Sequence, residues 1–140
     1  MYLEADILYA YLKPTDWLKT YAEKILSKKE KFITSVATVI EIEIVSLRDF
    51  GSEFSLSVLP RLKSIKNLEI LPLTVEIQEK AAEVRKTYGL SIFDSIHAAV
   101  CLLKKVKLIS SDVIFDKIKG LERIDPRNFL DTSTNLLHLL

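Results

Sequence analysis

Short apolar segments alternate with longer segments of helical periodicity along the whole chain. Residues 1–3, 32–35, 68–71 and 107–110 have the length of buried strands, and residues 121–124 are a shorter candidate. Between these segments, apolar residues recur at every third or fourth position, which predicts amphipathic helices. Parallel strands need crossover connections, so this alternation predicts an α/β fold with a mainly parallel sheet of four to five short strands, covered on both faces by helices.

Glycine and proline mark several predicted helix boundaries. The helix that follows the second strand ends at Gly51 and is apolar almost all round, so we expect it to be largely buried. Ser52 begins the next helix, and Pro60 inside its pattern is expected to kink or split it. The first helix is expected to begin at Ile7, and Thr15 or Asp16 is expected to cap the second.

Length and composition are those of one globular domain. The chain has 140 residues, of which 49% are hydrophobic and 28% charged, with few glycines and prolines. We assign residues 1–130 to a single domain. Residues 131–140 are expected to form a C-terminal tail that docks on the domain or on a partner, because its end is rich in leucine.

The charge balance and the single cysteine narrow the function classes. A formal net charge of +1 excludes a highly basic protein that coats nucleic acid nonspecifically. Cys101 has no partner for an internal disulfide and lies in an apolar helix pattern, which fits a reducing, cytoplasmic location. The sequence shows no apolar run long enough to predict a membrane span, and the early acidic residues argue against a signal peptide.

Acidic side chains occur where the fold predicts a ligand site. Glu4 and Asp6 come just after the first strand, and Asp112 comes just after the fourth. Glu41 lies on the apolar helix after the second strand, and Asp94 begins an apolar helix that leads to the fourth strand. In parallel α/β folds ligands bind outside the carboxyl ends of the strands, where strand order reverses. These carboxylates are therefore candidates for one site.

Each carboxylate also has a purely structural interpretation. Asp94 could complete a capping box, Asp6 could cap a helix that begins at Ile7, and Asp112 could cap the following short helix. Glu4 could be a charge at the end of a strand that faces solvent. Glu41 could form a buried ion pair with a lysine or arginine, since leaving a buried carboxylate unpaired costs about 3 kcal/mol or more of folding free energy.

Carboxylates gathered at one end of a sheet would repel each other, and a divalent cation removes that conflict. Mg²⁺ and Mn²⁺ prefer carboxylate oxygen and retain water ligands. Such an ion lowers the pKa of a bound water, orients it for in-line attack and offsets phosphoryl charge. We therefore expect a metal site whose substrate is a phosphodiester. His97, almost one turn after Asp94, is expected to be a core residue or a hydrogen-bond partner near the site rather than a ligand.

Four segments in this order resemble the PIN domain, the fold of the toxin nuclease in many prokaryotic VapBC toxin–antitoxin pairs. They are residues 2–8, 34–41, 90–99 and 108–115, and the resemblance extends from residue 1 to about residue 129. It implies a three-layer α/β/α sandwich and Mg²⁺- or Mn²⁺-dependent cleavage of single-stranded RNA. It further implies a homodimer and an antitoxin partner, one segment of which occupies a groove beside the acids.

The resemblance also assigns roles, with one departure at the first acid. Glu4 stands where the family has Asp, and Asp6 stands where it has Asn or Ser. Glu is one methylene longer, so Asp6 could replace Glu4 as a ligand or add to it. The implied metal ligands are thus Glu4, Asp94 and Asp112, with Asp6 as a substitute or addition. Glu41 would bind through water or orient the nucleophile.

Other residues have supporting roles in this interpretation. Ser110 or Ser111 matches a small polar residue of the family that can contact the metal-bound water or the phosphate. Asp116 is expected to be exposed or to support a nearby cation. Tyr9 or Tyr11 could stack on a base, although both could equally be core or interface residues. Candidate contacts to the RNA backbone are Arg61, Lys63, Lys66, Lys117 and Lys119.

Three other functions are compatible with parts of this pattern. A PIN-like interaction module that has lost cleavage stays open because Glu4 replaces the family's Asp. A haloacid-dehalogenase-like phosphatase is disfavoured because its chemistry needs an Asp nucleophile at that position. A phosphoacceptor receiver domain is disfavoured because it leaves Glu41 and Asp94 unexplained.

Overall fold

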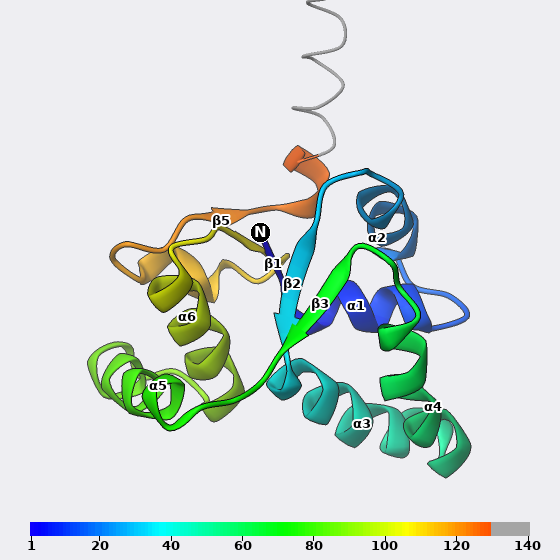
Figure 1. Cartoon of the computed structure of the whole chain (residues 1–140), viewed down its shortest axis with the longest axis horizontal. Helices are drawn as coiled ribbons and strands as arrows, with labels where there is room; N and C mark the ends of the chain where they lie inside the picture. The colour runs from blue at the N-terminus through cyan, green and yellow to red at the C-terminus, as the bar shows by residue number, and fades with distance from the viewer. Residues whose placement is uncertain (130–140) are drawn as a thin grey trace, which may run out of the picture.

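The computed structural model describes residues 1–129, and the predicted tail at 131–140 lies outside this described range. The order of strands and helices is that expected from the apolar pattern (Figure 1). The elements are β1 (Tyr2–Leu3), α1 (Ala5–Leu12), α2 (Lys19–Leu26), β2 (Phe32–Ser35), α3 (Val36–Phe50), α4 (Ser52–Lys63), β3 (Leu68–Leu71), α5 (Val75–Tyr88), α6 (Ile92–Lys104), β4 (Leu108–Ile109), the 3₁₀ helix η1 (Val113–Lys117) and β5 (Arg123–Ile124).

The five strands form one sheet in the order β3-β2-β1-β4-β5, and every pair of neighbours is parallel. The central strand β1 pairs through Tyr2 with Ile33 of β2 on one side and with Leu108 of β4 on the other. Strand order therefore reverses at β1, and the carboxyl ends of β1 and β4 flank the reversal. The structure confirms the predicted α/β fold with a parallel sheet between two helical layers.

Alternate residues of the strands enter two separate cores. Tyr2 and Leu108 pack with residues of α5 and α6, whereas Leu3, Ile109 and Phe32 pack with residues of α1 to α4. All five side chains are fully buried. Successive strand side chains point to opposite faces, so a strand covered on both faces must be apolar at every position. This is why the strands appear in the sequence as continuous apolar segments.

Helix caps place Asp94 at the start of α6. Gly89 ends α5 in the left-handed conformation with φ of +69°, which favours a residue without Cβ. Ser91 then caps α6, because its Oγ accepts a hydrogen bond from the Asp94 backbone N–H at 3.2 Å. Asp94 therefore lies in the first helical turn, where the helix dipole favours a negative charge.

Two predicted helix starts are wrong. Helix α1 begins at Ala5 rather than Ile7, because Glu4 is its N-cap and accepts a hydrogen bond from the backbone of Asp6. Helix α2 begins at Lys19 with Leu18 as its N-cap, after the predicted cap at Thr15 or Asp16. Pro60 was expected to kink or split α4, and the helix is not split but runs on to Lys63. Pro60 lies in the last turns of this helix, where few backbone hydrogen bonds remain to be lost.

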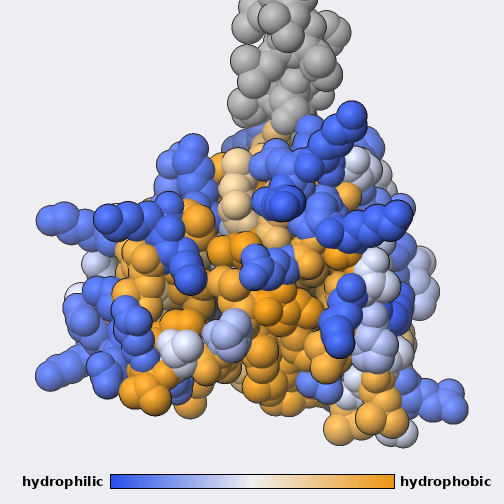
Figure 2. All heavy atoms as spheres, in the orientation of Figure 1, coloured by the Kyte–Doolittle hydropathy of each residue, from blue (hydrophilic) through white to orange (hydrophobic). Residues whose placement is uncertain are grey.

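The prediction that α3 is largely buried is also wrong. One side of this helix packs on the sheet. On another side, apolar residues three or four positions apart, from Val36 to Leu47, are 36–56% exposed. Exposed leucines of α4 lie beside it, and Figure 2 shows hydrophobic atoms over the region of α3 and the edge strand β3. We call this surface the apolar face; its residues are Val36, Ile40, Ile44, Leu47, Leu56 and Leu59.

None of the helices within residues 1–129 has the length and apolar character required to cross a membrane.

Candidate active site

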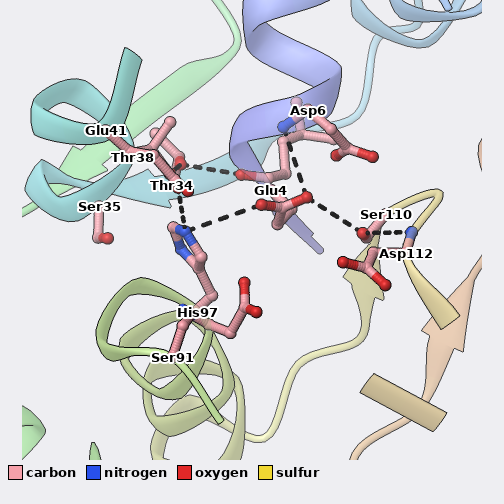
Figure 3. Close-up of polar contacts among 12 residues, drawn as sticks. Glu4, Asp6, Thr34, Ser35, Thr38, Glu41, Ser91, His97, Ser110 and Asp112 are labelled. Carbon is pink, nitrogen blue, oxygen red and sulfur yellow. Dashed lines mark hydrogen bonds and ion pairs between the residues drawn. The ribbon is translucent and has the colours of Figure 1, made fainter. Parts of the chain in front are cut away.

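A cleft of about 550 Å³ opens at the carboxyl ends of β1 and β4. Carboxylates of six residues line it, and Figure 3 shows several of them near His97. These acids are Glu4, Asp6, Glu41, Asp49, Asp94 and Asp112. The structure therefore brings together all five acids that were predicted from the sequence to form one site.

Glu4 is the most buried of these acids, with a relative exposure of 6%. Its Oε2 accepts a hydrogen bond from Ser110 Oγ at 3.1 Å and one from the Asp6 backbone N–H at 3.4 Å. Burial, and next the charge of Asp6, raise the pKa of Glu4 well above its ordinary value. The alternative of a solvent-facing charge is wrong for Glu4, because the N-cap position turns its side chain into the cleft floor.

Asp6 does not cap α1; its carboxylate reaches across to the loop after β4. Oδ2 accepts hydrogen bonds from the Ser111 backbone N–H at 2.8 Å and from Ser111 Oγ at 2.5 Å. Oδ1 is shielded from solvent and has no hydrogen-bond partner among the described residues. A shielded carboxylate oxygen without a donor is costly unless a cation or proton compensates it.

Glu41 extends from α3 to His97 of α6. Glu41 Oε1 lies 2.9 Å from His97 Nε2, and Glu4 Oε1 lies 3.9 Å from the same nitrogen. His97 is fully buried, while the Glu41 side chain is 26% exposed. Glu41 is therefore less buried than α3's apolar sequence indicated, and its partner is a histidine rather than the lysine or arginine considered as an alternative.

Asp94 and Asp112 form the outer part of the cleft. Asp94 is half-buried, and its pKa is raised, mainly by burial and further by the charges of Asp112 and Glu41. Asp112 is exposed, and its Oδ1 accepts a hydrogen bond from the Ile114 N–H at 2.9 Å, so it does cap η1. The Asp112 backbone N–H also donates to Ser110 Oγ at 3.0 Å. The capping role and the position in the cleft are thus compatible.

Asp116 lies outside the cleft-lining set. Its carboxylate oxygens accept hydrogen bonds from Arg123 at 2.7 and 3.0 Å, and the pKa of Asp116 is lowered by this pairing. Arg123 also donates to the Ser110 carbonyl at 2.9 Å. The cation that Asp116 supports is therefore the Arg123 guanidinium, which braces the loop that carries Ser110.

Two basic residues at the cleft were missed from the sequence. Lys13 and Arg48 line it, whereas none of the five cations proposed from the sequence does. Lys13 pairs with Asp16 at 2.6 Å, and Arg48 pairs with its neighbour Asp49 at 2.9 Å. Arg48 could have been found from its spacing, because it is seven residues after Glu41 and so shares a helix face with it.

Tyr9 also lines the cleft, whereas Tyr11 does not. The Tyr9 hydroxyl donates to Asp49 Oδ2 at 2.9 Å, and Lys13 Nζ lies 4.4 Å from the centre of the Tyr9 ring. Of the two tyrosines considered for base stacking, only Tyr9 is therefore placed beside the acids.

The residues present fit a divalent cation. One ligand atom each from Glu4, Glu41 and His97 lie within 4.8 Å of one another. The partnerless Asp6 Oδ1 is a carboxylate oxygen that the described residues leave uncompensated. Oxygen-rich donor sets of this kind suit Mg²⁺ or Mn²⁺.

Comparison with known families identifies the fold. The family model described as the PIN domain matches residues 1–121. The chain belongs to the PIN domain family. The resemblance noted from the sequence is thereby confirmed, and the match covers every acid of the cleft. No curated protein matches the sequence.

Solved structures support the PIN fold. The chain is similar to Mycobacterium tuberculosis VapC20, described as a sarcin–ricin loop cleaving toxin, with a TM-score of 0.71, 16% identity and coverage of 86% of this chain and 97% of that one. It is also similar to VapBC2 of Rickettsia felis bound to a promoter DNA fragment (0.69, 16%, 88% and 96%). A third is FitAcB of Neisseria gonorrhoeae (0.67, 17%, 90% and 97%). At these identities, the similarity shows that this PIN domain shares their fold.

Proposed function

We propose that this PIN domain is a divalent-metal-dependent endoribonuclease that cleaves single-stranded RNA, and that it is the toxin of a VapBC-type pair acting in the cytoplasm. The observation that carries the proposal is the convergence of the five predicted carboxylates in one cleft at the reversal of strand order. The toxin assignment is supported by the similar structures, which include toxin–antitoxin complexes.

In this proposal the acids have two roles, metal binding and orientation of the attacking water. Glu4, Asp94 and Asp112 would hold the metal, directly or through water, with Asp6 adding its Oδ1. A bound Mg²⁺ or Mn²⁺ supplies a water of lowered pKa and offsets phosphoryl charge. Glu41, on the α3 side of the cleft, would orient the attacking water.

Residues around the acids hold them and attract the substrate. Ser110 fixes Glu4 by a hydrogen bond, and Ser111 fixes Asp6 by two. Lys13 and Arg48 line the same cleft and provide positive charge for the RNA backbone. Tyr9 offers an aromatic ring beside them on which a base could stack.

Metal removal tests the proposal directly. We expect the wild-type protein to cleave a fluorescent single-stranded RNA in Mn²⁺ or Mg²⁺, to stop in excess EDTA and to recover when Mn²⁺ is restored. Glu41→Gln should slow cleavage about 10²-fold, the range for losing a positioned general base. Glu43→Gln is the matched control, because it alters a carboxylate on the same helix that does not line the cleft. Cleavage that persists in EDTA would contradict the metal-dependent mechanism.

A catalytically weak interaction module is the second candidate, and the burial of Glu4 is the observation that favours it. Because burial raises the pKa of this carboxyl, it resists ionisation and therefore resists binding a metal. The same assay separates the two functions. RNA that stays intact in both metals, with a folded protein, would favour the interaction module.

The apolar face supports a protein partner, and we assign it to a second copy of this chain. Exposed apolar side chains on two helices that pack against each other, α3 and α4, are typical of interaction surfaces. The double variant Ile44→Lys/Leu47→Lys should weaken the dimer about 100-fold or more, since burying each side chain contributes roughly 1.5–3 kcal/mol.

Light scattering after size exclusion would measure this change in mass. Val75→Lys is the control, because Val75 is an exposed apolar residue on α5, outside the apolar face. A wild-type protein that is monomeric at all concentrations would overturn the dimer assignment. If the wild type is monomeric and a co-purified antitoxin is displaced by the double variant, the face belongs to the antitoxin instead.

A further inference from the structure

A chain of buried hydrogen bonds connects the centre of the sheet to the acidic cleft. The Tyr2 hydroxyl of β1 lies 2.6 Å from His97 Nδ1 of α6, and His97 Nε2 lies 2.9 Å from Glu41 Oε1 of α3. Tyr2 and His97 are both fully buried. Three elements that are distant in sequence are therefore joined through one imidazole ring (Figure 3 shows His97 between Glu41 and Glu4).

The partners determine which ring nitrogen carries the proton. An ionised carboxylate such as Glu41 only accepts hydrogen bonds, so His97 Nε2 must be the donor. In a neutral imidazole Nδ1 is then an acceptor, and Tyr2 O–H donates to it. The Tyr2 oxygen can still accept from Ser35 Oγ, 2.8 Å away. This arrangement gives the Tyr2 hydroxyl and both ring nitrogens of His97 a hydrogen-bond partner, as buried polar groups require.

We infer that His97 is a positioning residue of this site: the Tyr2 hydroxyl holds the ring through Nδ1, and its Nε2–H holds the Glu41 carboxylate toward the cleft. The inference deepens the proposed nuclease function and rests on it for the role of Glu41. Neither Tyr2 nor His97 can touch RNA, because both are fully buried. Their effect on the reaction is to restrict the carboxylate that faces the solvent to one orientation before substrate arrives.

The competing interpretation is that His97 Nε2 is itself a metal ligand. Its distances to Glu4 and Glu41 permit this, since one ligand atom from each of the three residues lies within 4.8 Å of the others. Ligation needs a lone pair on Nε2, and so it needs the proton on Nδ1. The 2.9 Å contact with Glu41 instead favours a proton on Nε2. The two interpretations therefore predict opposite tautomers.

Nitrogen-15 NMR of the full chain distinguishes them. The chain has two histidines, and comparison with His97→Gln identifies the His97 signals. We expect an unprotonated Nδ1 and a protonated Nε2 in wild type, unchanged when diamagnetic Mg²⁺ is added. In Tyr2→Phe, which lacks only the hydroxyl, the Nε2 proton should remain and the Nδ1 signal should shift, because Nδ1 loses its hydrogen-bond donor. A proton on Nδ1 in wild type, or loss of the Nε2 proton when Mg²⁺ is added, would overturn the positioning role.

Kinetics provide the second readout. Tyr2→Phe should lower kcat for RNA cleavage about 10-fold or more and leave KM nearly unchanged, because residues that orient a site ligand typically contribute about 10–100-fold. His97→Gln retains an N–H near the Nε2 position, so it should keep more activity than His97→Leu. Equal activities of the Gln and Leu variants, both folded by circular dichroism, would count against the inference.

Failure of the proposed function is distinguishable from failure of this inference. If the wild type cleaves no RNA in any metal, the nuclease function fails, while the NMR tautomer still shows whether His97 donates to Glu41. If the wild type cleaves RNA but Tyr2→Phe changes neither the Nδ1 signal nor kcat, the nuclease function stands and the positioning role of His97 fails.

Discussion

Asp94→Asn is expected to lower the rate of RNA cleavage about 10³-fold, a loss of roughly 4 kcal/mol of transition-state stabilisation. The side chain lies in the first turn of α6 and lines the same cleft as Glu4 and Asp6 at the start of α1 and Glu41 on α3. Asn has nearly the same shape but no charge, so the variant removes a proposed metal ligand with little change in packing. Single-turnover cleavage in saturating Mn²⁺ measures the effect on the chemical step.

Two controls distinguish loss of a site residue from unfolding and from a general effect of charge. The Ser91 cap bonds the backbone N–H of residue 94, so Asp94→Asn should keep α6 intact, and its melting temperature should stay near that of wild type. Glu43→Gln again serves as the charge-matched control. Equal cleavage rates for wild type and Asp94→Asn would rule out the acidic cleft as the site of hydrolysis.

Glu4→Gln is expected to stabilise the metal-free protein by roughly 1–3 kcal/mol at neutral pH, the range for relieving an uncompensated buried polar group. The folded-state pKa of Glu4 is raised above its ordinary value of 4.5. Between these two values the folded state binds more protons than the unfolded state, so stability falls as pH rises. The difference in unfolding free energy between variant and wild type should therefore grow from about pH 4.5 upward.

With a divalent ion bound, the wild type should instead be more stable than Glu4→Gln. At about 100 times its Kd, Mn²⁺ would add about 2.7 kcal/mol to the stability of the wild type. Glu4→Gln should gain much less, because it lacks one proposed ligand charge. Urea unfolding with Mn²⁺ or EDTA at several pH values measures both effects. A wild type whose stability Mn²⁺ leaves unchanged would contradict a metal site at Glu4.

Some residues of the acidic site could be predicted from local sequence patterns, and others could not. Glu4, Asp94 and Asp112 could be predicted because each lies beside a strand end or helix start that the apolar pattern marks. Their convergence follows from the topology of parallel sheets, in which the carboxyl ends of all strands lie at one edge. Lys13 and Arg48 were missed because each is a single charged residue whose role depends on which face its element turns toward the acids.

Burial was the property that the sequence predicted least well. Glu41 was expected to be deeply buried on an apolar helix, yet Glu4 is the buried acid. The apolar pattern of α3 serves two surfaces, the sheet on one side and the exposed apolar face on the other. A helix that is apolar all round is buried only if something covers each side, and the described residues supply a cover for one side.

By itself, the sequence determined the order and type of the elements, the parallel sheet, the PIN family and the acids of the site, because strand and helix periodicities and helix caps are local properties. Tertiary structure alone decided that Ser111 holds Asp6 and that Tyr2 reaches His97 and, through it, Glu41. Those contacts join residues that are 56 to 105 positions apart, and they depend on strand order and on the rotation of α3 and α6 against the sheet. No local pattern encodes that rotation, because it results from packing both helical layers at once.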